Sequence, residues 1–144
     1  MTSRPDGGRR GLQLVLGTLA AIPFASGTAG MLVGSRALPG PIGPVSANLD
    51  SEYRYAHAMW FAVAPVLWSA LPRIEREGAT VRAVSAAVFL GGLARVGAWR
   101  ASGRPHPLLV GATGLELVRI PVLVAWQARV ARLAGREVPA CSAG

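Results

Sequence analysis

The residue best suited to carry chemistry is Glu116, the one carboxylate inside a long apolar run. Counted from Pro107, it lies about 12–13 Å into that run at the rise of an α-helix. A carboxylate at such a depth in a membrane must be paired, protonated or hydrated. Arg95 lies at a similar distance on the other side of the preceding turn, and Arg119 lies one helical turn after Glu116. These three residues form a candidate polar or ion-pair site. It either handles protons or anions, or it pins two helices together.

A second group of polar residues flanks the apolar runs on what we expect to be one side of a membrane. It comprises Asp50, Glu52, Arg54, His57, Arg100 and His106. Asp50 or Ser51 can cap the helix that begins there, and Glu52 suits its positively polarised first turn. Alternatively the group shares a polar pocket with the residues around Glu116, because polar groups in membranes tend to face inward.

The histidines and the cysteine do not favour a metal or a cofactor. His57 and His106 are the only histidines, and His106 stands between two prolines. Cys141 is the only cysteine, so it excludes an internal disulfide and a Cys-based zinc site. The sequence contains no Walker loop and no GxGxxG, GxSxG or HExxH string. We therefore expect no metal and no cofactor, and we assign no catalytic residue.

The composition indicates a small membrane protein. The chain has 144 residues, of which 51% are hydrophobic and 15% charged, whereas a soluble domain carries about 25% charged residues. The net charge of +8 is a feature of nucleic-acid-binding proteins. All 15 basic residues are arginines scattered at the ends of apolar runs, so we expect no nucleic-acid partner.

Four apolar runs each have the length of one membrane crossing, which takes about 20 helical residues. They predict an all-α integral membrane protein with four transmembrane helices in an antiparallel bundle. The expected helices span about 11–34, 53–71, 79–99 and 107–126, within a transmembrane domain at 11–127. Residues 1–10 and 128–144 are expected to be cytoplasmic tails, with disorder expected at 1–10 and 135–144.

Prolines and glycines mark the connections between these runs. Pro72 and Gly78 separate the second helix from the third, and Gly103, Pro105 and Pro107 separate the third from the fourth. The first connection, 35–51, is longer and rich in proline and glycine. We expect it to be an ordered loop without helix that covers the outer end of the bundle.

The arginines predict the orientation in a bacterial inner membrane, because cytoplasmic loops carry an excess of basic residues. Nine lie on the side of the termini: Arg4, Arg9, Arg10, Arg73, Arg76, Arg82, Arg129, Arg132 and Arg136. Four lie on the other side: Arg36, Arg54, Arg100 and Arg104. Both termini are therefore expected in the cytoplasm. A cleaved secretory signal ending near Ala25-Ser26-Gly27 is an alternative, although its apolar run would be longer than the usual 7–15 residues.

Small residues at steps of four predict which helix faces pack, because close approach drives helix association in lipid. The first helix has such a stripe at Gly17, Ala21, Ala25 and Ala29, with a second at Ser26, Gly30 and Gly34. The third helix has one at Ala83, Ala87 and Gly91, which leads to Arg95. We expect these stripes to lie inside the bundle.

Several motifs together resemble those of a bacterial family of small four-helix membrane proteins, catalogued only as a domain of unknown function. They are LDSEYR at 49–54, FLGGLAR at 89–95, GRPHP at 103–107 and LELV at 115–118, followed by Pro121. The similarity extends over roughly 10–127. It implies an integral inner-membrane protein and supplies no activity. Arg119 departs from the family pattern, in which an apolar residue is expected.

The sequence is compatible with three functions. The first is a non-enzymatic structural or accessory membrane protein, favoured by the lack of catalytic motifs. The second is a small oligomeric transporter or channel in which Glu116 titrates. The third, least favoured, is a membrane enzyme. The expected partners are the lipid bilayer and a second copy of the chain or another membrane protein.

Overall fold

Helix boundaries follow the prolines, glycines and capping side chains of the sequence. Pro5 and Pro107 occupy first helical positions, where a missing N–H costs little. The Ser46 hydroxyl accepts a hydrogen bond from the Leu49 N–H at 3.2 Å and caps the second helix. Gly34 and Gly103 have positive φ angles of 68° and 86°, which end the helices before them.

The computed structural model describes residues 5–40 and 42–136. Its elements are α1 (Pro5–Val33), η1 (Gly34–Ala37), α2 (Ala47–Ala70), η2 (Leu71–Arg73), α3 (Gly78–Ser102) and α4 (Pro107–Arg136). No strand occurs in these ranges. Arg4 and Cys141 lie outside them, as do the outermost parts of both expected tails.

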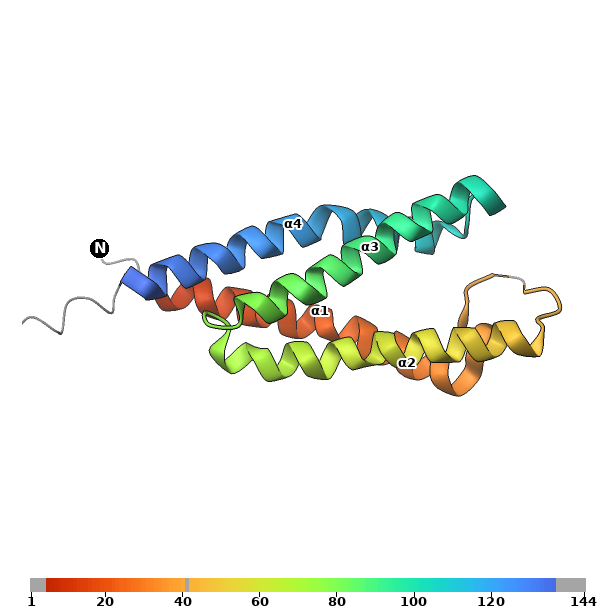
Figure 1. Cartoon of the computed structure of the whole chain (residues 1–144), viewed down its shortest axis with the longest axis horizontal. Coiled ribbons are helices and arrows are strands. Elements are labelled where there is room, and N and C mark those ends of the chain that lie inside the picture. Colours follow the sequence, from red (N-terminus) through yellow and green to blue (C-terminus); the bar gives the residue numbers. More distant parts are fainter. Residues whose placement is uncertain (1–4, 41, 137–144) are drawn as a thin grey trace, which may run out of the picture.

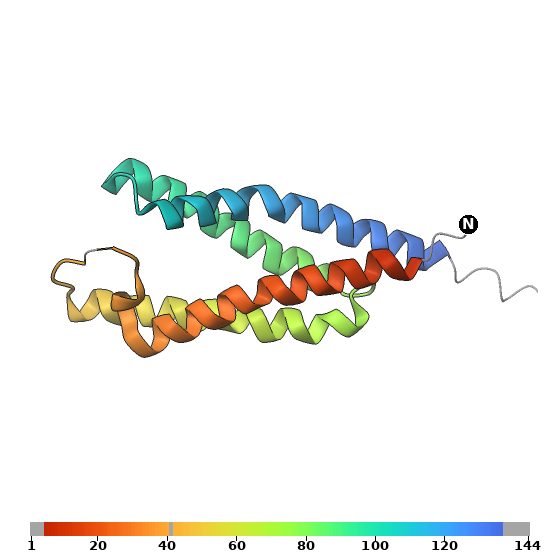
Figure 2. The ribbon, with the colours of Figure 1, turned by 180° about the vertical axis from the view of Figure 1, so that it is seen from behind.

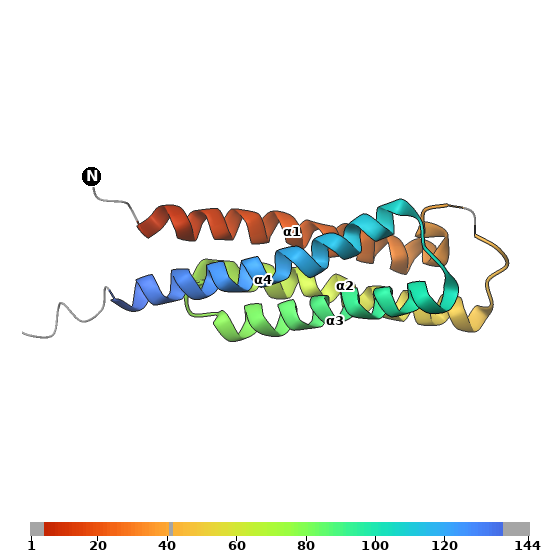
Figure 3. The ribbon, with the colours of Figure 1, turned by 90° about the horizontal axis from the view of Figure 1, so that it is seen from above.

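The four helices form two antiparallel hairpins, α1–α2 and α3–α4 (Figure 1). Each helix contacts its neighbours in sequence, and α4 returns to contact α1. Seen from behind, the hairpins meet where α1 begins and α4 ends, and their ribbons diverge toward the opposite end (Figure 2). Seen from above, α1 and α3 lie on opposite sides of the bundle (Figure 3). The expected all-α fold of four helices is therefore confirmed.

The apolar core lies where the hairpins meet. Leu12 and Leu16 of α1 pack with Ile74, Val81, Leu123 and Val130, which come from the α2–α3 turn, α3 and α4. A second cluster joins Ala20 of α1 to Ala64 and Leu67 of α2. The first core therefore spans both hairpins, so it holds them together at the end that carries the chain termini.

Glycines of α1 bring it into very close contact with α2. A Cβ added to Gly27 would lie 2.8 Å from the Phe61 backbone, and one added to Gly30 would collide with the His57 ring. A Cβ on Gly34 would collide with the Asp50 carboxylate. These three glycines are buried. Only glycine permits this spacing of the two helices.

The expected small-residue stripes are only partly correct. Gly30 and Gly34 pack as expected, but Ala21 and Ala25 are exposed. On α3 the expectation is wrong, because Ala83, Ala87 and Gly91 are all exposed. Gly92, one position along, faces α4 instead, where an added Cβ would lie 3.1 Å from Leu117. The helical period shows which residues share one face of a helix, but it does not show which face packs against a neighbouring helix.

Three helices extend well beyond the apolar runs that predicted them. Helix α2 begins at Ala47 and η1 spans Gly34–Ala37, so the expectation that the connection 35–51 contains no helix is wrong. Helices α1 and α4 are extended as well. Residues 5–10 belong to α1, partly because Arg9 binds Glu75 at 3.0 Å and the Pro72 carbonyl at 2.7 Å. Residues 128–136 belong to α4, where Val130 enters the core. Tertiary contacts thus order residues 5–10, which we expected to be disordered, and extend α4 into the expected C-terminal tail.

Three helices are long and apolar enough to cross a membrane: Gly7–Ala37, Gly78–Ser102 and Pro107–Gly135. Helix α2 is not among them. It has the necessary length, but its first half carries Asp50, Glu52, Arg54 and His57. Three of the four expected apolar spans are therefore found, and α2 is the exception.

Candidate functional site

The structure brings Arg95 and Glu116 together across the α3–α4 hairpin. The guanidinium Nη1 lies 3.2 Å from the carboxylate Oε1. Gly92 lies one turn before Arg95 on the face that approaches α4, where an added Cβ would lie 3.6 Å from the Glu116 Cβ. The contact expected from the matching depths of the two residues is present.

The two partners of this ion pair differ in exposure. The Glu116 side chain is 17% exposed and that of Arg95 is 43% exposed. Arg119 is exposed and makes no ion pair among the described residues. The candidate site is thus a pair that involves Arg95 and Glu116, without Arg119.

A second polar arrangement joins the end of α1 to the start of α2. The Asp50 carboxylate accepts hydrogen bonds from the backbone N–H and the hydroxyl of Ser35, at 3.0 and 3.2 Å. Its other oxygen accepts one from Arg54 Nε at 2.8 Å. Arg54 Nη1 in turn donates to the carbonyls of Met31 and Leu32, the two residues that precede Val33 at the end of α1. We call Ser35, Asp50 and Arg54 the polar lock.

The polar lock has a clear electrostatic signature. The Ser35 N–H and the Arg54 guanidinium lower the pKa of Asp50 from 3.8 to about 2, since both stabilise the carboxylate. Arg54 also places a positive charge against the C-terminus of α1, where the helix dipole is negative.

The capping role expected of Asp50 or Ser51 is wrong, because Ser46 caps α2 and the helix begins earlier, at Ala47. Asp50 therefore lies inside the first turns of α2, where its side chain is free to reach across to η1. The sequence LDSEYR thus contributes a contact between two helices rather than a cap within one.

The other members of the expected outer cluster do not form one pocket. Glu52 and Arg100 are exposed and make no ion pair among the described residues. His57 stacks on Tyr53 at 4.0 Å between ring centroids, and its Nδ1 lies 2.8 Å from the Tyr53 carbonyl. His106 Nδ1 accepts a hydrogen bond from the Leu108 N–H at the start of α4. Both histidines therefore have local structural contacts.

Sequence reasoning overlooked two glutamines that hold the α2–α3 turn. Gln127 of α4 is 1% exposed and donates a hydrogen bond to the Ile74 carbonyl at 3.0 Å. Gln13 of α1 donates to the Leu71 carbonyl at 2.7 Å. An uncharged amide within an apolar run was the available signal, since a polar group there needs a partner.

The described residues include no group of three His, Cys, Asp or Glu side chains that could hold a metal ion. Their polar side chains instead make pairwise contacts between helices and with backbone carbonyls. Fold and site together define an all-α protein of four helices, three of them apolar enough to cross a membrane.

The chain belongs to the family described as a domain of unknown function, DUF4345, whose model matches residues 11–127. This match confirms the resemblance indicated by the motifs and covers nearly the same range. Neither the curated proteins nor the solved structures contain a match to this chain.

Proposed function

We propose that this protein is a multi-pass inner-membrane protein of bacteria, with four crossings and both termini in the cytoplasm, and that it has a non-enzymatic structural or accessory role. Large apolar side chains on its surface support insertion in lipid: Leu32 is 75% exposed, Leu14 71% and Val118 69%. Such exposure is costly in water and neutral in a bilayer.

The inclusion of α2 among the crossings rests on its length and on the polar lock. Its 24 residues span about 36 Å as a helix, more than the hydrocarbon thickness of about 30 Å. Two of the charged residues at its start, Asp50 and Arg54, are paired with each other, and Arg54 also binds the end of α1. These contacts reduce the cost of placing that end of α2 near the membrane surface.

One observation carries the structural role: Arg95 and Glu116 bind each other across the α3–α4 hairpin. An ion pair of this kind joins two helices without requiring a substrate. The exposed stripe at Ala83, Ala87 and Gly91 adds a smooth face on α3 that suits packing against another membrane helix. A second copy or another membrane protein is the partner that we propose for it.

Glu116→Gln tests the role of the ion pair. Purified wild-type and variant proteins are placed in vesicles that contain a pH-sensitive dye, and proton flux is compared with thermal stability. We expect the variant to melt at a lower temperature while proton flux stays equal to that of empty vesicles in both samples. Wild-type flux that disappears in Glu116→Gln would contradict the structural role.

A small oligomeric transporter or channel is the second candidate. It is favoured by the partial exposure of both partners, 17% for Glu116 and 43% for Arg95, which leaves the pair within reach of water. The flux experiment separates the two candidates, because only a transporter requires the Glu116 carboxylate to move protons.

The topology is tested with single cysteines at Ala37 and Ala47, two exposed positions near the first connection. Cys141 is replaced by Ser in both variants. A membrane-impermeant thiol reagent added to whole cells should label both positions. If the reagent labelled these cysteines only after the cells were opened, the first connection would lie in the cytoplasm, and the proposed orientation would be contradicted.

A further inference from the structure

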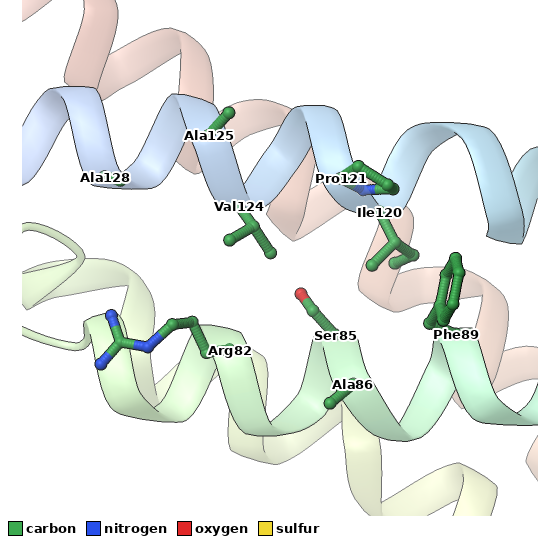
Figure 4. A pocket seen from close by; sticks show the side chains of 9 residues that line it. All are labelled: Arg82, Ser85, Ala86, Phe89, Ile120, Pro121, Val124, Ala125 and Ala128. Carbon is green, nitrogen blue, oxygen red and sulfur yellow. The ribbon is translucent and has the colours of Figure 1, made fainter.

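A groove of about 500 Å³ lies between α3 and α4. Figure 4 shows its lining side chains, which come from one face of each helix. On α3 these include Arg82, Ser85 and Phe89, and on α4 Pro121 and Val124. Apart from Arg82 and Ser85, the lining side chains are apolar.

Ser85 is the unusual residue of this groove. It is only 7% exposed, and its hydroxyl points from α3 toward Val124 of α4 (Figure 4). Buried helical hydroxyls usually bond the carbonyl four residues earlier, as Thr113 does at 2.9 Å. No hydrogen bond among the described residues involves the Ser85 hydroxyl. No buried side-chain oxygen of the described residues lacks a hydrogen-bond partner, so the Ser85 oxygen is not enclosed but opens onto the groove, where its hydroxyl can donate to a ligand.

Arg82 supplies the charge at one end of the groove. Its guanidinium lies over Gly78, the first residue of α3, since a Cβ added there would be 3.0 Å from Nη1. The positive end of the α3 dipole lies at the same place. Arg82 makes no ion pair among the described residues. An anion at this end would therefore meet a free guanidinium and a favourable helix dipole.

The polar and apolar parts follow one another along α3. At the helical rise, Ser85 lies about 4.5 Å beyond Arg82, and Phe89 about 6 Å beyond Ser85. A phospholipid presents its phosphate, ester carbonyl and acyl chain in the same order. We propose that the groove binds an anionic phospholipid, with its phosphate at Arg82, an ester carbonyl at Ser85 and an acyl chain along Phe89 and Pro121.

This inference rests on the proposed location in a membrane. With the termini in the cytoplasm, Arg82 would lie at the cytoplasmic surface, and the bound lipid would belong to that leaflet. The exposed arginines at the same end, Arg73, Arg76 and Arg129, favour an anionic headgroup over a zwitterionic one.

The test measures lipid binding by native mass spectrometry of the full-length protein released from detergent. Phosphatidylglycerol, phosphatidylethanolamine and inorganic phosphate are titrated separately. We expect one phosphatidylglycerol to bind more tightly than phosphatidylethanolamine, and inorganic phosphate not to displace it. Equal binding of the two lipids, or displacement by phosphate alone, would overturn the proposal.

Variants locate the binding in the groove. Arg82→Gln should weaken phosphatidylglycerol binding about tenfold, and Ser85→Ala about threefold, from the loss of a charged and a neutral hydrogen bond. Ala86→Leu should block the groove, whereas Ala83→Leu, on the exposed stripe, should bind as the wild type does. Arg100→Gln, an exposed arginine in the last turn of α3 at the opposite end of the helix, is the matched control for charge and should bind as the wild type does. Unchanged binding in both Arg82→Gln and Ala86→Leu would overturn the proposal.

A separate measurement keeps this inference distinct from the proposed function. Alkaline carbonate extraction of cell membranes reports whether the chain is integral. Release by carbonate would contradict the membrane location and the lipid site together. Retention in the membrane with unchanged lipid binding in the groove variants would contradict the lipid site alone.

Discussion

The two hairpins are held together in different ways. In α1–α2, buried glycines bring the backbones close, and the polar lock closes the end near the first connection. In α3–α4, an ion pair and close approaches at Gly92 and Gly78 join the helices, and a groove remains between them. The first hairpin is therefore closely packed at these glycines, whereas the second leaves the surface of a groove and a partly exposed ion pair accessible to other molecules.

The largest expected effect comes from filling a close contact of the first hairpin. Gly27→Leu should lower the free energy of unfolding by about 3 kcal/mol, because its Cβ would meet the Phe61 backbone, which cannot move aside. Unfolding by sodium dodecyl sulfate, followed by tryptophan fluorescence, measures this change. The matched control is Gly91→Leu on α3, where an added Cβ meets nothing within 4 Å. Equal losses in the two variants would remove the difference between the hairpins.

A smaller effect is expected from the ion pair of the second hairpin. Arg95→Gln should cost about 2 kcal/mol, because it leaves the more buried Glu116 carboxyl without a partner. Glu116→Gln should cost about 1 kcal/mol, since the remaining guanidinium is 43% exposed and reaches water.

The double variant sharpens this comparison. Arg95→Gln with Glu116→Gln should lose less than the sum of the single losses, because it leaves no unpaired charge. Arg119→Gln is the control, since Arg119 is exposed and makes no ion pair among the described residues. Additive losses would show that the two side chains do not stabilise each other.

The smallest effect concerns the pH dependence of the polar lock. The pKa of Asp50 is lowered in the folded state, so its stabilising contribution is complete well above pH 3.8 and is lost as the pH falls toward about 2. The melting temperature of the wild type should therefore fall more steeply in this range than that of Asp50→Asn. Glu52→Gln, which changes an exposed neighbouring carboxylate, should follow the wild type. Parallel curves for wild type and Asp50→Asn would contradict the lock.

Much of the fold could be predicted from the sequence. The breaks at Pro72, Gly78 and Gly103 lie where the helices end, and their number follows from the apolar runs. The contact between Arg95 and Glu116 was also predictable, because residues at equal distances from a tight turn meet across an antiparallel hairpin. The roles of Asp50 and Arg54 were not, since their partners, Ser35 and the end of α1, lie across a long connection.

The sequence by itself determined the four helices, the turns that separate them and the depth of the one carboxylate within an apolar run. Only the tertiary structure decided which of the small-residue stripes pack: Gly30 and Gly34 do, together with Gly27, while Ala83, Ala87 and Gly91 stay exposed. The physical reason is that helical periodicity groups residues on faces, whereas the choice of face depends on how two surfaces fit. In an apolar solvent, that fit and not hydrophobicity selects the partner.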